Sequence, residues 1–284
     1  MIHYRVCEEK DLDLMYEAFN KGFSDYIVKV DITKDRFKDI FLGIEQNDFK
    51  YSFIALDDAK PIGLMLGGIK DYEGVKTLRC GALCIDPKYR HMGIATNLFK
   101  FHKELAAKNN CQQLFLEVIK GNDKAINFYR KQGYQIIYDI TYFKHGNPKE
   151  IVSFQNPMIE VKPITFNDAY FYYEHTEKHH MNWQSDFDFQ KILGNHVNYF
   201  GAFKDNKMIG VISLNKTGKI YYLHVLEQYR LNGVGTKLLN DITQRFNLDV
   251  LLINTTNNHM LINFLIKHHF EIQVINQYEL YLPL

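Results

Sequence analysis

One stretch of the chain has residue types suited to binding an anion: Leu83-Cys84-Ile85-Asp86-Pro87-Lys88-Tyr89-Arg90-His91-Met92-Gly93-Ile94-Ala95-Thr96. Proline ends the apolar, strand-like run at Ile85, and a helical spacing of apolar residues begins at Ile94. Unpaired backbone N–H groups at a helix start attract phosphate oxygens, and Gly93 has no Cβ to obstruct them. The stretch therefore predicts a phosphate-binding loop. The alternative is that its small residues only allow tight packing.

A second motif follows downstream, at Asn122-Asp123-Lys124-Ala125-Ile126-Asn127-Phe128-Tyr129-Arg130-Lys131-Gln132-Gly133-Tyr134. It is preceded by Arg90-x-x-Gly93-x-Ala95 and by Leu116-Glu117-Val118. In this order the motifs resemble the GNAT superfamily of acyl-CoA-dependent N-acyltransferases, over about residues 78–134. The resemblance implies acetyl-CoA as a co-substrate and no metal.

The resemblance also implies which residues bind acetyl-CoA. The loop and helix start would hold the diphosphate, while a strand segment would offer main-chain hydrogen bonds to the pantetheine arm and to the oxyanion. In the family, neighbouring strands splay apart to admit that arm. Asn122 would bond the pantetheine, cap its helix, or do both. The expected cofactor-binding residues are Leu83, Cys84, Ile85, Arg90, His91, Met92, Gly93, Ile94, Ala95, Thr96 and Asn122.

Two side chains are candidates for proton transfer. An alkyl ammonium has a pKa near ~10, so a base must take a proton before the amine can attack. By resemblance to GNAT enzymes that acetylate protein N-termini, Glu117 is the candidate base and Tyr129 the candidate acid. The alternatives are a Glu117 that fixes neighbouring backbone and a Tyr129 that is a core aromatic residue. Tyr26 either contacts the acceptor or packs on the core.

Composition narrows the class of protein. The 284 residues suffice for two domains, and the formal net charge of +1 argues against a nucleic-acid tail or a polybasic membrane patch. No signal peptide or long apolar run is present, so we expect a cytoplasmic protein without membrane association. Cys80 and Cys84 would project to one face of a shared strand as buried thiols. The adjacent pairs His179-His180 and His268-His269 diverge too far to chelate a metal.

Periodicity predicts a mixed α/β domain in the first half. The expected strands are 1–6, 52–56, 62–69, 78–85 and 113–119, and helices are expected from Asp11, over 33–42 with Thr33 as N-cap, and from Ile94. Helices alternate with strands, which indicates a mixed sheet flanked by helices.

The second half repeats the first. Tyr89-Arg90 and Gly93 correspond to Tyr229-Arg230 and Gly233, and the correspondence extends over most of each half. We therefore expect a tandem duplication of the GNAT fold, with a catalytic domain at 1–150 and a second domain at 151–284. The linker is expected near 146–148, before Pro157.

The copies differ at the candidate catalytic positions. The loop Arg230-x-x-Gly233-x-Gly235 is intact, but Ile253 replaces Glu117 and Leu265 replaces Tyr129. We expect the second domain to be structural or substrate-shaping, with weak or vestigial acyl-CoA binding, although Tyr221, Tyr222 and His224 could offer substitutes.

These observations predict an N-acetyltransferase that moves an acetyl group from acetyl-CoA to a primary amine by direct attack. The alternative is a non-catalytic acyl-CoA-binding sensor or scaffold. The acceptor is a small molecule or a peptide, and the chain a monomer or homodimer; the sequence does not decide between these.

Overall fold

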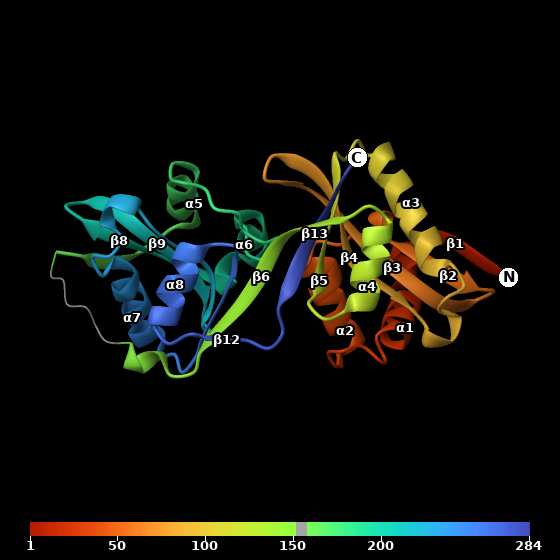
Figure 1. Ribbon diagram of the computed structural model, residues 1–284, viewed down its shortest axis with the longest axis horizontal. Coiled ribbons are helices and arrows are strands. Elements are labelled where there is room, and N and C mark those ends of the chain that lie inside the picture. The colour runs from red at the N-terminus through yellow and green to blue at the C-terminus, as the bar shows by residue number, and fades with distance from the viewer. Residues whose placement is uncertain (152–157) are drawn as a thin grey trace. The chain divides into compact units, whose positions relative to one another are not determined.

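The computed structural model describes residues 1–151 and 158–284, and it divides into two compact units (Figure 1). Unit 1 contains residues 1–137 and 278–284, and unit 2 contains residues 138–277. Pro157, which the expected linker precedes, lies outside the described residues. In the described ranges no helix has both the length and the apolar character needed to cross a membrane.

Unit 1 is built on a sheet in the order β1-β2-β3-β4-β5-β13. Its first four strands pair antiparallel, whereas β4 and β5 pair in parallel. The strands are β1 (Ile2–Val6), β2 (Phe53–Asp57), β3 (Lys60–Tyr72), β4 (Val75–Ile85), β5 (Gln113–Ile119) and β13 (Gln277–Pro283). The helices are α1 (Leu12–Gly22), α2 (Lys34–Phe37), α3 (Ile94–Lys108) and α4 (Asp123–Lys131).

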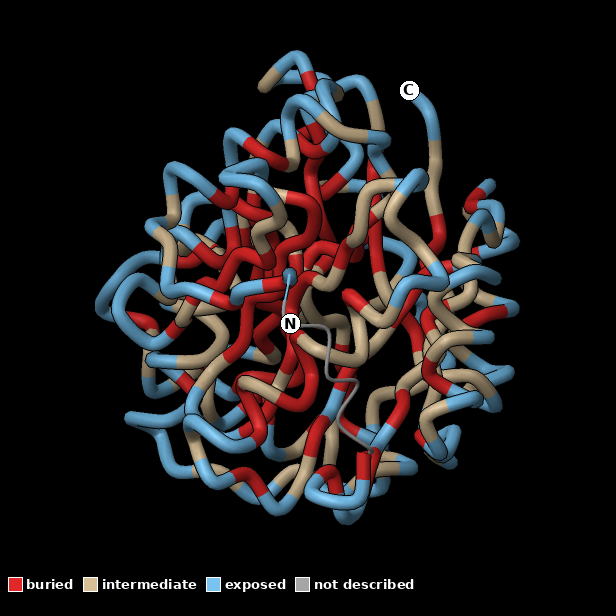
Figure 2. The backbone as a smooth tube through the Cα atoms, turned by 90° about the vertical axis from the view of Figure 1, so that its left-hand side faces the viewer, coloured by how far each residue is buried: buried red, intermediate tan, exposed pale blue. Residues whose placement is uncertain are grey.

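Helices cover both faces of this sheet. Met15 and Phe19 of α1 pack with Phe37 of α2 on one face, and Leu98 of α3 and Ile126 of α4 pack on the other. The helix expected over 33–42 begins as predicted, because the Thr33 side chain accepts a hydrogen bond from the Arg36 N–H at 3.3 Å. It then continues as a π-helical segment from Lys38 to Ile44. Buried stretches run through the interior, with exposed loops outside (Figure 2).

A β-bulge in β4 changes the faces to which Cys80 and Cys84 project. The register with β3 shifts so that Leu66 faces Ala82 while Gly67 faces Cys80, which leaves Gly81 as the extra residue. The bulge reverses the alternation of faces, so Cys80 packs with α3 and α4 whereas Cys84 packs with α1. The prediction of one shared face was therefore wrong. Both thiols are buried and free, as expected.

Unit 2 has a corresponding sheet in the order β6-β11-β10-β9-β8-β7. Its strands are β6 (Gln135–His145), β7 (Glu160–Ile164), β8 (Val197–Lys204), β9 (Lys207–Asn215), β10 (Lys219–Val225) and β11 (Leu251–Thr256), and the short β12 (Glu271–Ile272) pairs with β6. Its helices are α5 (Phe166–Glu174), α6 (Phe187–Leu193), α7 (Val234–Phe246) and α8 (His259–Lys267). Apolar side chains of α7 and α8 pack into the core of unit 2.

The units do not follow the expected linear division at residue 150. Most of β6 belongs to unit 2, where it pairs antiparallel with β11, and β13 from the end of the chain lies beside β5 in unit 1. Each half of the sequence thus supplies a strand to the other unit. Strand partners distant in sequence leave no local signal, so periodicity could not place this boundary.

One buried histidine should make the free energy of unfolding depend on pH in the acidic range. His102 of α3 is fully buried, neither ring nitrogen has a partner in the described residues, and burial lowers its pKa from 6.5 to about 3. Between these values only the unfolded chain takes up the proton, so stability should fall with falling pH by up to about 1.4 kcal/mol per unit. Urea unfolding of His102→Met should lack this loss, whereas exposed His259→Met should retain it.

Candidate functional site

The site in unit 1 begins where two parallel strands diverge. Pairing between β4 and β5 runs from Thr77 opposite Gln113 to Arg79 opposite Phe115. Both strands then continue unpaired with each other, β4 to Ile85 and β5 to Ile119. The segment Leu83-Cys84-Ile85 therefore lies on the diverging part of β4. This is the strand geometry that the resemblance implied for an extended pantetheine arm.

The predicted phosphate-binding loop lies directly beyond β4. A 3-10 turn spans Pro87–Tyr89, and the backbone then takes positive φ at His91 (65°) and at Gly93 (78°). Gly93 precedes α3 without a side-chain cap, so no side chain occupies the first N–H groups of this helix. His91, Met92, Gly93 and Thr96 are exposed, Ala95 is half-buried, and Ile94 anchors the helix in the core. The loop can therefore present backbone donors to phosphate oxygens from solvent.

The Arg90 side chain holds the loop itself. Its Nη1 and Nη2 donate to the two carboxylate oxygens of Asp25 at 2.6 and 2.7 Å, and its Nε donates to the Ile85 carbonyl at 3.2 Å. Asp25 immediately precedes Tyr26, so Arg90 ties the loop to the segment expected to face the acceptor. Its side chain thus contacts protein, and its part in cofactor binding stays a prediction.

Glu117 is buried in an ion pair. Its Oε2 accepts a hydrogen bond from Arg79 Nη2 at 2.5 Å, while Arg79 Nη1 bonds Glu45 at 2.7 Å. The other carboxylate oxygen, Oε1, is buried with no hydrogen-bond partner among residues 1–151 and 158–284. Burial raises the pKa of Glu117, and the Arg79 charge opposes that rise. A carboxylate with one free oxygen and a raised pKa is suited to accept a proton.

Tyr129 lies on the opposite face of the sheet from Glu117. Its hydroxyl is 3.8 Å from Cys80 Sγ, next to the last paired residue of β4, Arg79. Burial raises the pKa of Tyr129 well above its usual value, so the phenol keeps its proton. Asn122 caps α4 by accepting a hydrogen bond from the Ala125 N–H at 3.3 Å. Glu117 thus lies two residues beyond the last paired residue of β5, and the Tyr129 hydroxyl lies beside Cys80, one residue beyond the last paired residue of β4.

Unit 2 repeats the scaffold without this pair. The β10–β11 pairing ends at Ile220 opposite Ile253, and Gly233 precedes α7 with φ 77° and no side-chain cap. Arg230 Nε donates to the Val225 carbonyl at 2.9 Å, as Arg90 does to Ile85. Ile253 and Leu265 are buried hydrocarbon side chains, and neither can move a proton.

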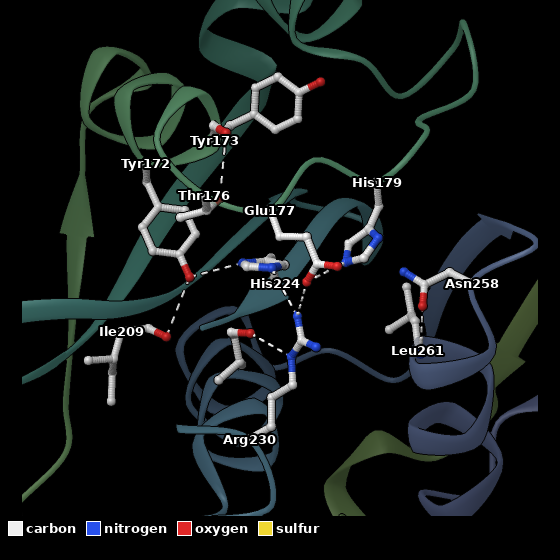
Figure 3. A network of polar contacts seen from close by, with 11 residues as sticks. Tyr172, Tyr173, Thr176, Glu177, His179, Ile209, His224, Arg230, Asn258 and Leu261 are labelled. Carbon is white, nitrogen blue, oxygen red and sulfur yellow. Dashed lines mark hydrogen bonds and ion pairs between the residues drawn. The ribbon is translucent and has the colours of Figure 1, made fainter. Parts of the chain in front are cut away.

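A pocket opens in unit 2 between the diverging ends of β10 and β11. Its lining includes Tyr222 and His224 of β10, Thr255 of β11 and Asn258 at the start of α8. His224 is nearly buried and accepts a hydrogen bond from Arg230 at 3.3 Å, while its Nδ1 lies 3.0 Å from the Tyr172 hydroxyl (Figure 3). Burial lowers the His224 pKa to about 4, so the imidazole is neutral at physiological pH.

Three side chains beside this pocket have metal-ligating atoms within 4.8 Å of one another: Glu177, His179 and His224. Arg230 donates to Glu177 at 3.2 Å as well as to His224 (Figure 3). A permanently charged guanidinium thus lies where a cation would bind. We therefore interpret the cluster as a polar network that holds Arg230 and the segment after α5.

The sequence analysis did not identify the charged partners of Glu117 and Arg90. Arg79 links Glu117 to Glu45, and Asp25 anchors Arg90. A signal existed for Arg79, because an arginine between Leu78 and Cys80 in an apolar strand needs a buried partner. The choice of partner depends on contacts far apart in sequence.

Comparison with known proteins agrees with this architecture. The family model described as the acetyltransferase (GNAT) family matches residues 12–134 and 163–270. N-alpha-acetyltransferase 30 of Schizosaccharomyces pombe is 32% identical over 87 residues, which is 30% of this chain and 57% of that relative. The chain therefore matches little more than half the length of this relative.

Two solved structures resemble the whole chain. A tandem GNAT protein from the clavulanic acid biosynthesis pathway has a TM-score of 0.68 at 17% identity, covering 100% of this chain and 98% of that one. A GCN5-related N-acetyltransferase from Sphaerobacter thermophilus has a TM-score of 0.71 at 10% identity, covering 99% and 95%. At these identities the likeness shows the fold alone.

The two matched regions, one in each unit, define a protein with two GNAT units in tandem. The chain belongs to the acetyltransferase (GNAT) family. The predicted family and tandem architecture are thus confirmed, and the family uses acetyl-CoA. The roles of individual site residues stay predictions.

Proposed function

We propose that unit 1 transfers the acetyl group of acetyl-CoA to a primary amine by direct attack in a ternary complex. One observation supports the proposal: Glu117 lies two residues beyond the last paired residue of β5, and the Tyr129 hydroxyl lies beside Cys80, one residue beyond the last paired residue of β4. Glu117 accepts the proton that the ammonium group loses. The amine nitrogen then attacks the thioester carbonyl, the C–N bond forms, and the C–S bond breaks. Tyr129 donates a proton to the departing thiolate, and the Tyr129 phenolate recovers a proton from the new amide nitrogen, which carries one in excess.

The backbone of unit 1 supplies the remaining parts. The N–H groups around Gly93 hold the diphosphate, and the diverging segment from Leu83 to Ile85 directs the pantetheine arm. A main-chain N–H of that segment stabilises the tetrahedral oxyanion. Holding both reactants together accounts for most of the acceleration.

The acceptor is best sought among peptide and small-molecule amines. The match to an N-alpha-acetyltransferase makes a peptide α-amine the first candidate. We propose measuring free thiol release from acetyl-CoA with a peptide, a polyamine, an amino acid and an aminoglycoside. Amine-dependent release supports acetyl transfer. Acetyl-CoA binding without release for any amine in this panel would favour the sensor or scaffold.

A matched pair of glycines tests which unit is catalytic. A Cβ at Gly93 would meet no atom within 4 Å, but φ 78° disfavours alanine by about 1 kcal/mol and the methyl group would face the phosphates. We expect Gly93→Ala to raise the KM for acetyl-CoA about 10-fold. Gly233→Ala, at the same φ in unit 2, should leave KM and kcat unchanged. The reverse pattern would place catalysis in unit 2, which we propose is structural or substrate-shaping.

A further inference from the structure

One arginine joins three segments of unit 1 that are far apart in the sequence. Arg90 Nε donates to the Ile85 carbonyl at 3.2 Å, and its Nη2 donates to the Gly22 carbonyl at 3.1 Å. Its two terminal nitrogens also bond the Asp25 carboxylate, at 2.6 and 2.7 Å. A planar guanidinium that meets a carboxylate through two bonds fixes its orientation as well as its distance. These bonds, the Arg90 link, hold the end of β4, the end of α1 and the turn after α1 together.

The turn after α1, residues 23–26, begins directly against the strand segment that we expect to direct the pantetheine arm. Gly22 ends α1 so close to β4 that an added Cβ would lie 2.6 Å from the Cβ of Cys84. Cys84 Sγ also donates to the Ala18 carbonyl of α1, at 3.6 Å. Since Cys84 is the middle residue of Leu83-Cys84-Ile85, the turn starts at the predicted cofactor site.

The turn places Tyr26 near the candidate acid. The rings of Phe23 and Tyr26 meet edge to face with centroids 4.9 Å apart, and Phe23 packs on the core cluster that contains Cys84. Tyr26 lies within electrostatic range of Tyr129 and adds to the effect of burial in raising the Tyr129 pKa. The segment that the Arg90 link holds therefore extends from the cofactor loop toward the predicted site of proton transfer.

Unit 2 has the same link with a different acid. Arg230 Nε donates to the Val225 carbonyl at 2.9 Å, and its Nη2 donates to Glu177 at 3.2 Å. In each unit the acid is the third residue after the first helix: Asp25 follows α1, and Glu177 follows α5. The arginine and the acid are 65 residues apart in unit 1 but 53 apart in unit 2. Both units thus make the contact although its spacing in the sequence differs, which favours a role for the contact itself.

We propose that Asp25 is a positioning residue for the acceptor amine: it holds Arg90, so that binding of acetyl-CoA at the loop orders the turn 23–26 and the Tyr26 side chain. This inference rests on the proposed function of unit 1. A diphosphate on the N–H groups around Gly93 restrains the neighbouring Arg90, and the bidentate pair passes that restraint to the turn. By linkage, the ordered turn then favours binding of both reactants together.

Amide hydrogen exchange of the full-length chain tests the link without any acceptor. The Ser24 and Tyr26 N–H groups bond the Lys21 and Phe23 carbonyls at 3.3 and 3.1 Å, so their exchange reports opening of the turn. In the free protein, Asp25→Asn should speed exchange at both amides about fivefold, the upper value for an exposed ion pair. Acetyl-CoA should slow exchange at both amides in the wild type but not in Asp25→Asn.

Asp13→Asn is the matched control. Asp13 pairs with Lys34 at 2.6 Å and joins the opposite end of α1 to α2. Its substitution should leave exchange at Ser24 and Tyr26 unchanged, with or without acetyl-CoA. Unchanged exchange in free Asp25→Asn would overturn the inference. So would a wild type in which acetyl-CoA protects residues 91–96 but not these two amides. If acetyl-CoA does not protect residues 91–96 either, the proposed function is wrong, and the positioning role falls with it.

Steady-state kinetics with the amine that gives turnover connect the link to catalysis. Asp25→Asn should raise the KM for the amine about fivefold and leave kcat within about twofold, because it removes no proton-transfer group. Asp25→Glu, which keeps a carboxylate on an exposed turn, should return KM to within about twofold of the wild-type value. A lower kcat at unchanged KM, or the same rise in Asp13→Asn, would reject the positioning role. Absence of turnover with every amine would count against the proposed function instead.

Discussion

Replacing Tyr129 by phenylalanine should lower kcat about 100-fold, the low end of the range for loss of a general acid. The hydroxyl is the atom removed, and it lies where β4 and β5 diverge, 3.8 Å from Cys80 Sγ. The substitution does not alter the predicted phosphate-binding loop, so the affinity for acetyl-CoA should stay within about twofold of the wild-type value. Steady-state kinetics with a fixed amine and a calorimetric titration with acetyl-CoA measure the two quantities separately.

Tyr134→Phe is the matched control for this experiment. Tyr134 is also buried, its ring lies 5.5 Å from that of Tyr129, and its hydroxyl has no partner within the described ranges. Its removal deletes the same atom from the same cluster without affecting the gap. We expect kcat close to that of the wild type. Equal losses in both variants would indicate a packing effect and would discredit the acid role of Tyr129.

Replacing Arg79 by leucine should destabilise the fold by about 3–5 kcal/mol. The guanidinium is 4% exposed and pairs with Glu45 and Glu117, so its loss removes the positive partner of the buried Glu117 carboxylate. Urea unfolding at pH 7 measures the loss. The difference from the wild type should shrink toward pH 4, because without Arg79 the pKa of Glu117 rises further and its neutral form is less costly to bury.

A double-variant cycle separates charge from packing. In the Arg79→Leu background, Glu117→Gln should destabilise much less than it does alone, since it removes a carboxylate that no longer has a partner. Arg130→Leu, an exposed change on α4, should cost less than about 0.5 kcal/mol. Additive effects of Arg79→Leu and Glu117→Gln would contradict an ion pair that matters to stability.

Local patterns in the sequence were enough to predict the helices and strands and the loop that precedes α3. The segment from Gln113 to Ile119 is a strand as predicted, Thr33 caps its helix, and Gly93 takes the positive φ that glycine favours. These features depend on residues within a few positions of one another, and so did the duplication, which repeats local motifs. The family and the tandem fold could therefore be predicted.

Contacts between distant segments decided the rest. The sequence by itself determined the duplicated scaffold, the conformation of the loop at Gly93 that we predict to bind phosphate, and the candidates Glu117 and Tyr129. Only the tertiary structure brought Arg79 to Glu117 and placed β13 beside β5. Burial of charge and the pairing of strands depend on which distant segments come into contact. The free energy of such contacts produces no periodic pattern in the sequence, so it could not be predicted from local motifs.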